Sequence, residues 1–259
     1  MSMKKTLMLS DFINTSVIRL FPVMNLTATA DRILFCIWNI RMADELIDIF
    51  DDNLNFISQA MKSEAHNNSW WHKVFFCWLI RRTKDGRRKI WLQLRNKRKL
   101  IGGGLLDASS AGHFAAGENL QQALCREVKE ELGLDLPFDN IIQFGITKRL
   151  SGNKAIKNAE IVHRCYAQTS ATLSELCLQK NELDGIFEMD LEDAIALFND
   201  DVPEITITGL AIGENNAYIP TIRQVLIADF MDYGKNTYRD FFINLQNMLK
   251  ENDNGGRNN

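Results

Sequence analysis

Three glutamates crowd the segment REVKEELGL at residues 126–134: Glu127, Glu130 and Glu131. On a helix with 3.6 residues per turn, positions i, i+3 and i+4 share one face. Like charges at that spacing repel one another, so the segment accepts a local electrostatic cost. Either water screens the three carboxylates or a positive group belongs there, and carboxylate oxygens are the hard ligands that Mg²⁺ prefers.

The glutamates are part of a longer spaced pattern. Five residues separate Gly112 from Glu118, seven more lead to Arg126-Glu127-Val128, and the pattern closes with Glu130-Glu131-x-Gly133-Leu134. It resembles the Nudix box, with every fixed position and both aliphatic positions filled. A solvated, charge-rich helix face would account for REVKEEL alone but leaves the rest of the pattern unexplained.

The resemblance implies an α+β protein with the α/β/α sandwich of the Nudix fold. It implies an enzyme that hydrolyses a diphosphate linked to a further group X, in a nucleoside diphosphate or a related organic diphosphate, with Mg²⁺ or Mn²⁺ as cofactor. Glu127 and Glu131 are the implied metal ligands, with Glu130 close behind them. The family leaves the base open among Glu130, Glu131 and a loop acid such as Glu182.

The remaining box positions have structural roles. Gly112 lets the backbone come close to a bound ion, because glycine has no side chain. Arg126 is placed off the glutamate face and is expected to pair with Glu118, which holds the loop on the helix. Gly133 ends the helix where a left-handed residue is usually needed.

A second resemblance covers residues 43–200. ELIDIFDDN, EAHNNSWWHK and LLDASSAGHFAAGE are similar to the isopentenyl-diphosphate-isomerase-like branch of Nudix proteins. In that isomerase, three histidines and a glutamate bind a metal, and His66, His72, His113 and Glu160 fall close to those places. Packing or capping roles stay open for each histidine, and His163 is expected to be structural.

Two departures count against isomerisation. The isomerase has a catalytic cysteine immediately before the glycine of the box, and this chain has Ala111, which cannot transfer a proton. The isomerase also has a degraded box, whereas this one is intact. The sequence therefore favours a hydrolase, with an isoprenoid-diphosphate isomerase or a non-catalytic nucleotide- or RNA-binding module as alternatives.

The stretch 81–99 carries ten Lys or Arg residues against a single Asp. It is read first as a solvated hairpin and second as a positive rim for polyanionic substrates. Within it, Arg95 is the best candidate for substrate binding, because this branch usually places a substrate-facing arginine after the strand KIWLQL. Lys97 is a weaker candidate, and RNA binding is not favoured because few aromatic residues are interleaved.

Strands and helices alternate irregularly along the chain, which predicts a mixed sheet. Asp85-Gly86 marks a hairpin between strands at 73–80 and 89–94. The predicted helices cover 118–132, 191–198 and the region from Tyr218 onward, and the other predicted strands lie at 45–53, 141–150, 160–167, 182–190 and 203–208.

Four segments are predicted. Residues 1–41 form an N-terminal extension outside the family pattern, 42–210 the Nudix domain, 211–250 a helical extension that caps the sandwich or makes a homodimer contact, and 251–259 a disordered tail. No apolar run reaches the roughly 20 residues of a membrane helix. Five scattered cysteines and a net charge of −3 suit a cytoplasmic protein that does not bind nucleic acid.

Overall fold

The two apolar runs around Asp85-Gly86 form a long hairpin, β3 (Trp71–Arg82) and β4 (Arg88–Arg95). Gly86 adopts φ +88°, a left-handed conformation that glycine takes without strain. The fold is that of a computed structural model, which describes residues 44–99, 101–152 and 157–255. The hairpin predicted from the sequence is confirmed.

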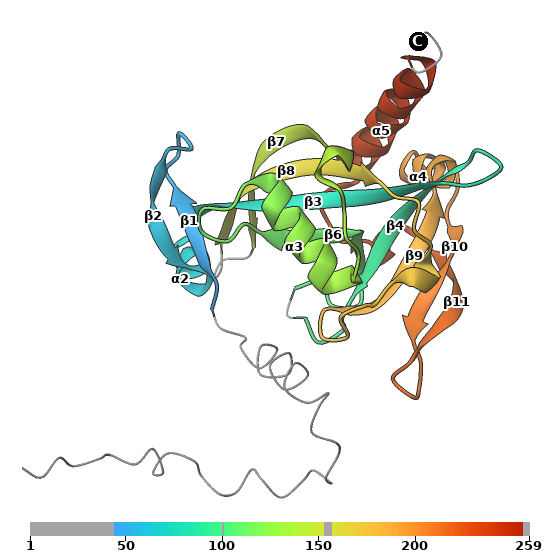
Figure 1. Ribbon diagram of the computed structural model, residues 1–259, viewed down its shortest axis with the longest axis horizontal. Coiled ribbons are helices and arrows are strands. Elements are labelled where there is room, and N and C mark those ends of the chain that lie inside the picture. The colour runs from blue at the N-terminus through green and yellow to red at the C-terminus, as the bar shows by residue number, and fades with distance from the viewer. Residues whose placement is uncertain (1–43, 100, 153–156, 256–259) are drawn as a thin grey trace, which may run out of the picture. The chain divides into compact units, whose positions relative to one another are not determined.

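The strands of the described residues join in one mixed sheet (Figure 1). The main path runs β11-β10-β9-β4-β3-β1-β2, with β5 beside β4, β6 and β8 beside β3, and β7 beside β8. Strands β3 and β8 pair in parallel, whereas the other ladders are antiparallel. The further strands are β1 (Leu46–Phe50), β2 (Phe56–Met61), β5 (Leu106–Ala108), β6 (Ser110–His113), β7 (Ile141–Gly152), β8 (Lys157–Gln168), β9 (Leu183–Asp190), β10 (Ile205–Ile212) and β11 (Tyr218–Val225).

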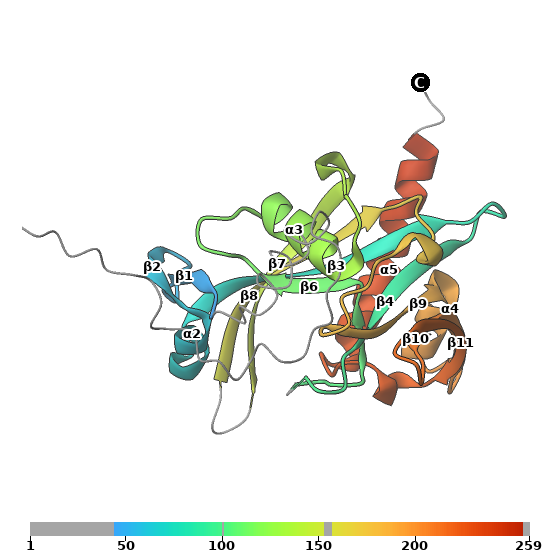
Figure 2. The same ribbon diagram turned by 60° about the horizontal axis from the view of Figure 1, so that its bottom comes forward.

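Side chains alternate between the faces of β3 and so build two cores. Phe75, Cys77 and Leu79 pack beneath helix α3 (Leu120–Leu132). Phe76 and Trp78 belong to the opposite core with α4 (Leu191–Phe198) and α5 (Lys235–Gly255). Helices thus cover both faces of the sheet, as Figures 1 and 2 show, and the predicted α/β/α sandwich with a C-terminal helix is confirmed.

Helix α3 forms as its sequence predicts. The Asn119 side chain accepts a hydrogen bond from the Gln122 N–H at 2.9 Å and so caps the helix N-terminus. At the other end Gly133 adopts φ +73° and its N–H donates to Lys129 O at 3.0 Å. The helix buries an apolar stripe along one face: Leu120, Ala123, Leu124, Val128 and Leu132.

The C-terminal region differs from its prediction. Residues 218–225 are not helical but form the edge strand β11, paired with β10. Pro220 lies in β11, where an edge position tolerates the missing N–H and the interior of a helix would not. The helix begins only at Lys235 and continues to Gly255, so residues 251–255 are helical rather than a disordered tail.

Two elements between the first strand and the hairpin were not predicted. Strand β2 leads directly into helix α2 (Lys62–Asn68), which carries His66. Asp44 accepts a hydrogen bond from the Ser63 N–H at 3.0 Å and so holds the start of α2. The predicted extension 1–41 lies outside the described residues. None of the helices described is long and apolar enough to cross a membrane.

Candidate active site

Strand β6 lies against the glutamate face of α3. Gly112 in β6 leaves just enough room for Glu127, because a β-carbon at position 112 would lie 2.7 Å from the Glu127 carboxyl carbon. Two residues earlier, Ser110 Oγ donates to Glu131 Oε2 at 3.0 Å. The loop-to-helix pattern of the sequence therefore places Glu127 and Glu131 side by side beneath one short strand.

Arg126 fixes the loop that leads into α3. Its Nε and Nη2 donate to the two carboxylate oxygens of Glu118, each at 2.9 Å, which is the predicted pairing in bidentate form. Nη2 also donates to His113 O at 3.1 Å. The arginine does not stay clear of the glutamate face, however, because Nη1 lies 2.9 Å from Glu127 Oε1 and 3.7 Å from Glu130 Oε2.

The three glutamates on α3 have raised pKa values. Burial raises the pKa of Glu127 to about 7 against the opposing effect of Arg126, and Glu45 and Glu130 raise it further. Burial and then the charge of Glu127 raise the pKa of Glu131 well above its ordinary value. Burial also raises the pKa of Glu130. A cluster of carboxylates that resists full ionisation is short of positive charge.

Glu118 behaves in the opposite way. Burial disfavours its charged form, but the hydrogen bonds from Arg126 and from the Ala115 N–H outweigh that effect and lower its pKa. Glu118 is therefore an ionised structural partner of Arg126. Glu127, Glu130 and Glu131 are the carboxylates that a bound cation would stabilise.

The three candidate histidines come together. Ligand atoms of His66, His72 and His113 all lie within 4.8 Å of one another, and the two Nε2 atoms of His66 and His113 are 3.2 Å apart. His72 Nδ1–H donates to Trp70 O, 2.8 Å away, and the buried Nε2 of His72 has no partner among the described residues. Burial lowers the pKa of all three, to about 4 for His66, and neutral imidazoles are the form that binds metals.

Glu160 lies next to this cluster, since it pairs with His72 across β3 and β8. Its carboxylate is turned to other partners: Arg149 Nε donates to it at 2.7 Å, and Asn158 forms a further short hydrogen bond. The structure therefore brings together the three histidines but gives Glu160 an ion pair in place of a position among the ligand atoms.

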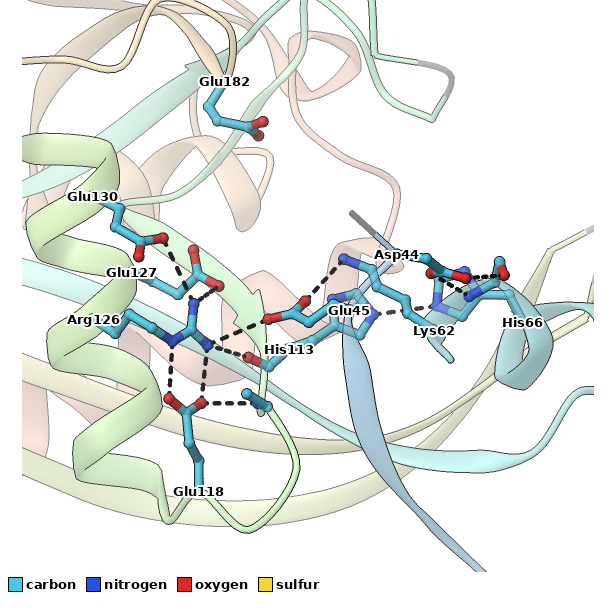
Figure 3. Close-up of polar contacts among 12 residues, drawn as sticks. Asp44, Glu45, Lys62, His66, His113, Glu118, Arg126, Glu127, Glu130 and Glu182 are labelled. Carbon is cyan, nitrogen blue, oxygen red and sulfur yellow. Dashed lines mark hydrogen bonds and ion pairs between the residues drawn. The ribbon is translucent and has the colours of Figure 1, made fainter. Parts of the chain in front are cut away.

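The other candidate residues, Arg95, Lys97 and Glu182, each interact with different partners. Arg95 is held by buried Asp107, at 3.2 Å, and by Ile101 O. Lys97 is exposed, and its backbone N–H donates to Asp184. Glu182, in the loop before β9, forms an ion pair with Lys99 and faces the α3 carboxylates across the site in Figure 3.

Much of the basic charge of the hairpin is paired. Arg81 binds Glu188 through two hydrogen bonds of 2.8 and 2.9 Å. Arg87 and Lys89 both contact Asp190. Three of the ten basic residues of the stretch are thus ion-paired with acids of β9.

Glu45 is a residue that nothing in the sequence singles out. It lies 3.7 Å from Arg126 Nη2 and 3.6 Å from Lys62 Nζ. Figure 3 shows this carboxylate between the α3 glutamates and the helix that carries His66. Glu45 precedes a short strand as one of many acids in the chain, so only the tertiary fold reveals its place.

The donor sets fit divalent metals. On α3, buried carboxylates whose pKa values are raised by burial and by each other would gain from a hard cation such as Mg²⁺. At the histidines, an orphaned buried Nε2 and two neighbouring rings fit a borderline metal such as Zn²⁺.

The mixed-sheet sandwich, with the glutamates of α3 packed against Gly112 of β6, is the arrangement of a Nudix domain. The NUDIX domain family model matches residues 70–207, slightly more than half of the chain. The chain belongs to this family and is a Nudix hydrolase, which confirms the expected family and enzyme class.

Relatives extend this picture. The chain is 27% identical over 174 residues to an uncharacterised Nudix hydrolase of Clostridium acetobutylicum, covering 67% of this chain and 83% of that one. It is 31% identical over 101 residues to isopentenyl-diphosphate Delta-isomerase 2 of Photorhabdus laumondii, covering 39% of this chain and 55% of the isomerase. A crystal structure from Deinococcus radiodurans is similar over 60% of this chain and 90% of its own, at 18% identity and a TM-score of 0.45.

Proposed function

We propose that this protein is a divalent-metal-dependent diphosphatase that cleaves a nucleoside diphosphate-X or a related organic diphosphate by attack of water on phosphorus. The observation that carries the proposal is the convergence of Glu127, Glu130 and Glu131 on α3. Glu127 and Glu131 meet β6 at a glycine and a serine, which leaves their carboxylates together at one site.

The glutamates have two roles, metal binding and proton transfer. Glu127 and Glu131, with Glu130, would hold Mg²⁺ or Mn²⁺, which when bound neutralises phosphoryl oxygens and lowers the pKa of a coordinated water. Glu130, the least buried of the three, or Glu131 accepts the proton from the attacking water. Glu182 stays a further candidate base on the opposite side of the site.

The substrate's phosphates need cations from the protein. Lys97 is exposed beside the site, and Arg95 presents a planar guanidinium that Asp107 orients. The partner is therefore a small-molecule diphosphate. Nucleic acid is disfavoured, since Arg81, Arg87 and Lys89 are engaged by acids of the same hairpin and β9.

Isomerisation is the alternative that the isomerase relative suggests. Ala111 lies in β6 between Ser110 and Gly112, and it packs partly against the core on the α5 side of the sheet. A methyl group cannot donate or accept a proton, so the carbon chemistry would lack one of its two groups. In a hydrolase, His66, His72 and His113 would still bind a metal.

We also propose a cytoplasmic setting. Cys77, Cys125, Cys165 and Cys177 are all unpaired thiols, which is the usual state in a reducing compartment.

A panel of diphosphates incubated with Mg²⁺ or Mn²⁺, with products identified by mass, tests the function. Glu130→Gln and Glu131→Gln are expected to lose at least about 100-fold in kcat, whereas Glu204→Gln, an exposed acid before β10, keeps wild-type activity. Turnover without metal, or equal activity in the three variants, would contradict the proposal.

A further inference from the structure

A second concave site lies on the face of the sheet opposite α3. A cavity of about 240 Å³ opens between strands β3, β7 and β8 and helix α5. Drug-sized ligands need roughly 300–1,000 Å³, so this space suits one small ring. None of the α3 carboxylates lines it.

The cavity has flat aromatic walls. Trp78 and Phe241 stack with ring centroids 3.8 Å apart, and Tyr233 and Tyr238 stack at 5.8 Å. All four of these residues line the space. The rings of each pair already pack on one another, so a guest would lie against the outside of a pair, and flat ring surfaces favour a planar guest over a branched or spherical one.

Two buried polar groups of these walls lack a partner. Trp78 Nε1 and Tyr238 Oη have no hydrogen-bond partner among the described residues, although the two side chains are only 5% and 2% exposed. A buried donor left unsatisfied is costly, so such groups usually mark a missing acceptor. An indole N–H can only donate, and the guest must therefore offer acceptor atoms.

The charge of the cavity is positive. Arg149 is neutralised by Glu160, and its guanidinium lies over the rings of Phe76 and Tyr233 at 4.9 and 4.5 Å. Arg164 is half-buried beside it and has no acceptor in the part of the chain that the structure describes. Burial and the nearby Arg149 lower the pKa of Arg164, which means that its charge is uncompensated there.

We propose that this cavity binds a small planar anion, such as an aromatic carboxylate. Arg164 holds the charge of the anion, Trp78 and Tyr238 donate to its acceptor atoms, and the aromatic walls stack on its ring. The anion comes from one of two sources: a free small molecule, or the group X of the diphosphate substrate. The second source rests on the proposed hydrolase function.

The location allows either source. Tyr233 Oη donates to Asp107, which also binds Arg95, the candidate phosphate ligand. On the other side Arg149 binds Glu160, the sheet neighbour of His72. One series of hydrogen bonds thus leads from the cavity to Arg95, and an ion pair leads from it to the strand neighbour of His72.

Titration of the full-length protein with benzoate, followed by NMR, tests the site. The readout is the indole N–H signal of Trp78, assigned by its loss in Trp78→Phe. We expect benzoate to shift this signal and neutral benzamide, its isostere, to bind at least about tenfold more weakly. Arg164→Gln should weaken benzoate about 10- to 100-fold, and Arg164→Lys less. Tyr238→Phe, which keeps the ring, should weaken it several-fold.

Arg239→Gln is the matched control, since this arginine lies on the same helix α5 but pairs with its exposed neighbour Asp240. Benzoate should bind this variant as it binds the wild type. An unmoved Trp78 signal, equal effects of benzoate and benzamide, or undiminished binding to Arg164→Gln would overturn the proposal and leave a water-filled cavity.

The titration needs no turnover, so it stands even if hydrolysis of every diphosphate fails. Where turnover is found, inhibition kinetics separate the two sources. Competition between benzoate and the substrate would assign the cavity to group X, and binding without a change in KM would assign it to a separate ligand. Both results support the site.

Discussion

Gly112 in strand β6 lies so close to the Glu127 side chain of helix α3 that no side chain fits between them. A β-carbon on residue 112 would stand 2.7 Å from the carboxyl carbon of Glu127 and 2.7 Å from its Oε1. The glycine of the motif is thus required by the glutamate of the motif, and the two positions, fifteen residues apart in sequence, act as one feature.

Gly112→Ala should therefore displace Glu127 while leaving the fold intact, because the obstructing atoms are the far end of a flexible side chain. A misplacement of about 1 Å can cost a rate factor of about 100, and we expect a loss of that order in kcat/KM. Thermal unfolding should change little. Gly145→Ala, in strand β7 with nothing within 4 Å of the new β-carbon, is the control that should keep full activity. Equal activity in both variants would refute the steric account.

The histidine cluster makes a prediction about metal binding. His66, His72 and His113 offer three imidazoles within 4.8 Å, so we expect Co²⁺ or Zn²⁺ to bind, with Co²⁺ giving a visible absorption spectrum. Replacing any one of the three by Asn should weaken binding by at least about 100-fold. His163→Asn is the control, because His163 packs against Phe114 and is not a member of the cluster. An unchanged Co²⁺ spectrum in the triple variant would rule the site out.

His163 provides a pH prediction of its own. Burial and then the charge of Lys73 lower its pKa to about 4, and both ring nitrogens are buried without a partner among the described residues. The unfolded chain takes up a proton near pH 6.5 while the folded chain does not, so this residue's contribution to stability is complete above pH 6.5 and is lost as the pH falls toward 4. Urea unfolding at pH 7 and pH 5 should show a smaller pH effect in His163→Leu than in wild type. The same slope in both proteins would contradict the assignment.

Two N-terminal deletions, of residues 1–41 and of residues 1–45, test where the folded domain begins. Asp44 holds the start of α2 and Glu45 approaches both Arg126 and Lys62. We expect removal of residues 1–41 to leave activity and melting temperature nearly unchanged, whereas removal of 1–45 should lower both. A drop of several degrees for the shorter deletion would show that residues 1–41 pack on the core.

The sequence predicted those parts of the fold whose signals are local. Helix α3 has an apolar stripe and ends at Gly133, and the hairpin has Asp85-Gly86 between two apolar runs. Helix α2 escaped prediction because KSEAHNN buries only Ala65 and so has no apolar stripe. Strand β11 was mistaken for helix because an edge strand that exposes Ile219 and Ile222 lacks a clean alternation.

The same division holds in the site. The Glu118–Arg126 pair follows from the motif, and the meeting of three histidines follows from a resemblance to the isomerase branch. Glu45 could not be found, since its role arises where β1 passes α3. The ion pair of Glu160 with Arg149 depends on the register of β7 and β8, which one sequence does not specify.

Hydrolysis in H₂¹⁸O with Mg²⁺, with mass analysis of both products, tests the central claim most directly. If water attacks phosphorus under the control of the α3 carboxylates, one ¹⁸O should appear in a phosphate-bearing product, none should appear on the alcohol of group X, and Glu131→Gln should abolish the incorporation. Label on a carbon-bound oxygen, a product of unchanged mass, or undiminished incorporation in Glu131→Gln would contradict it.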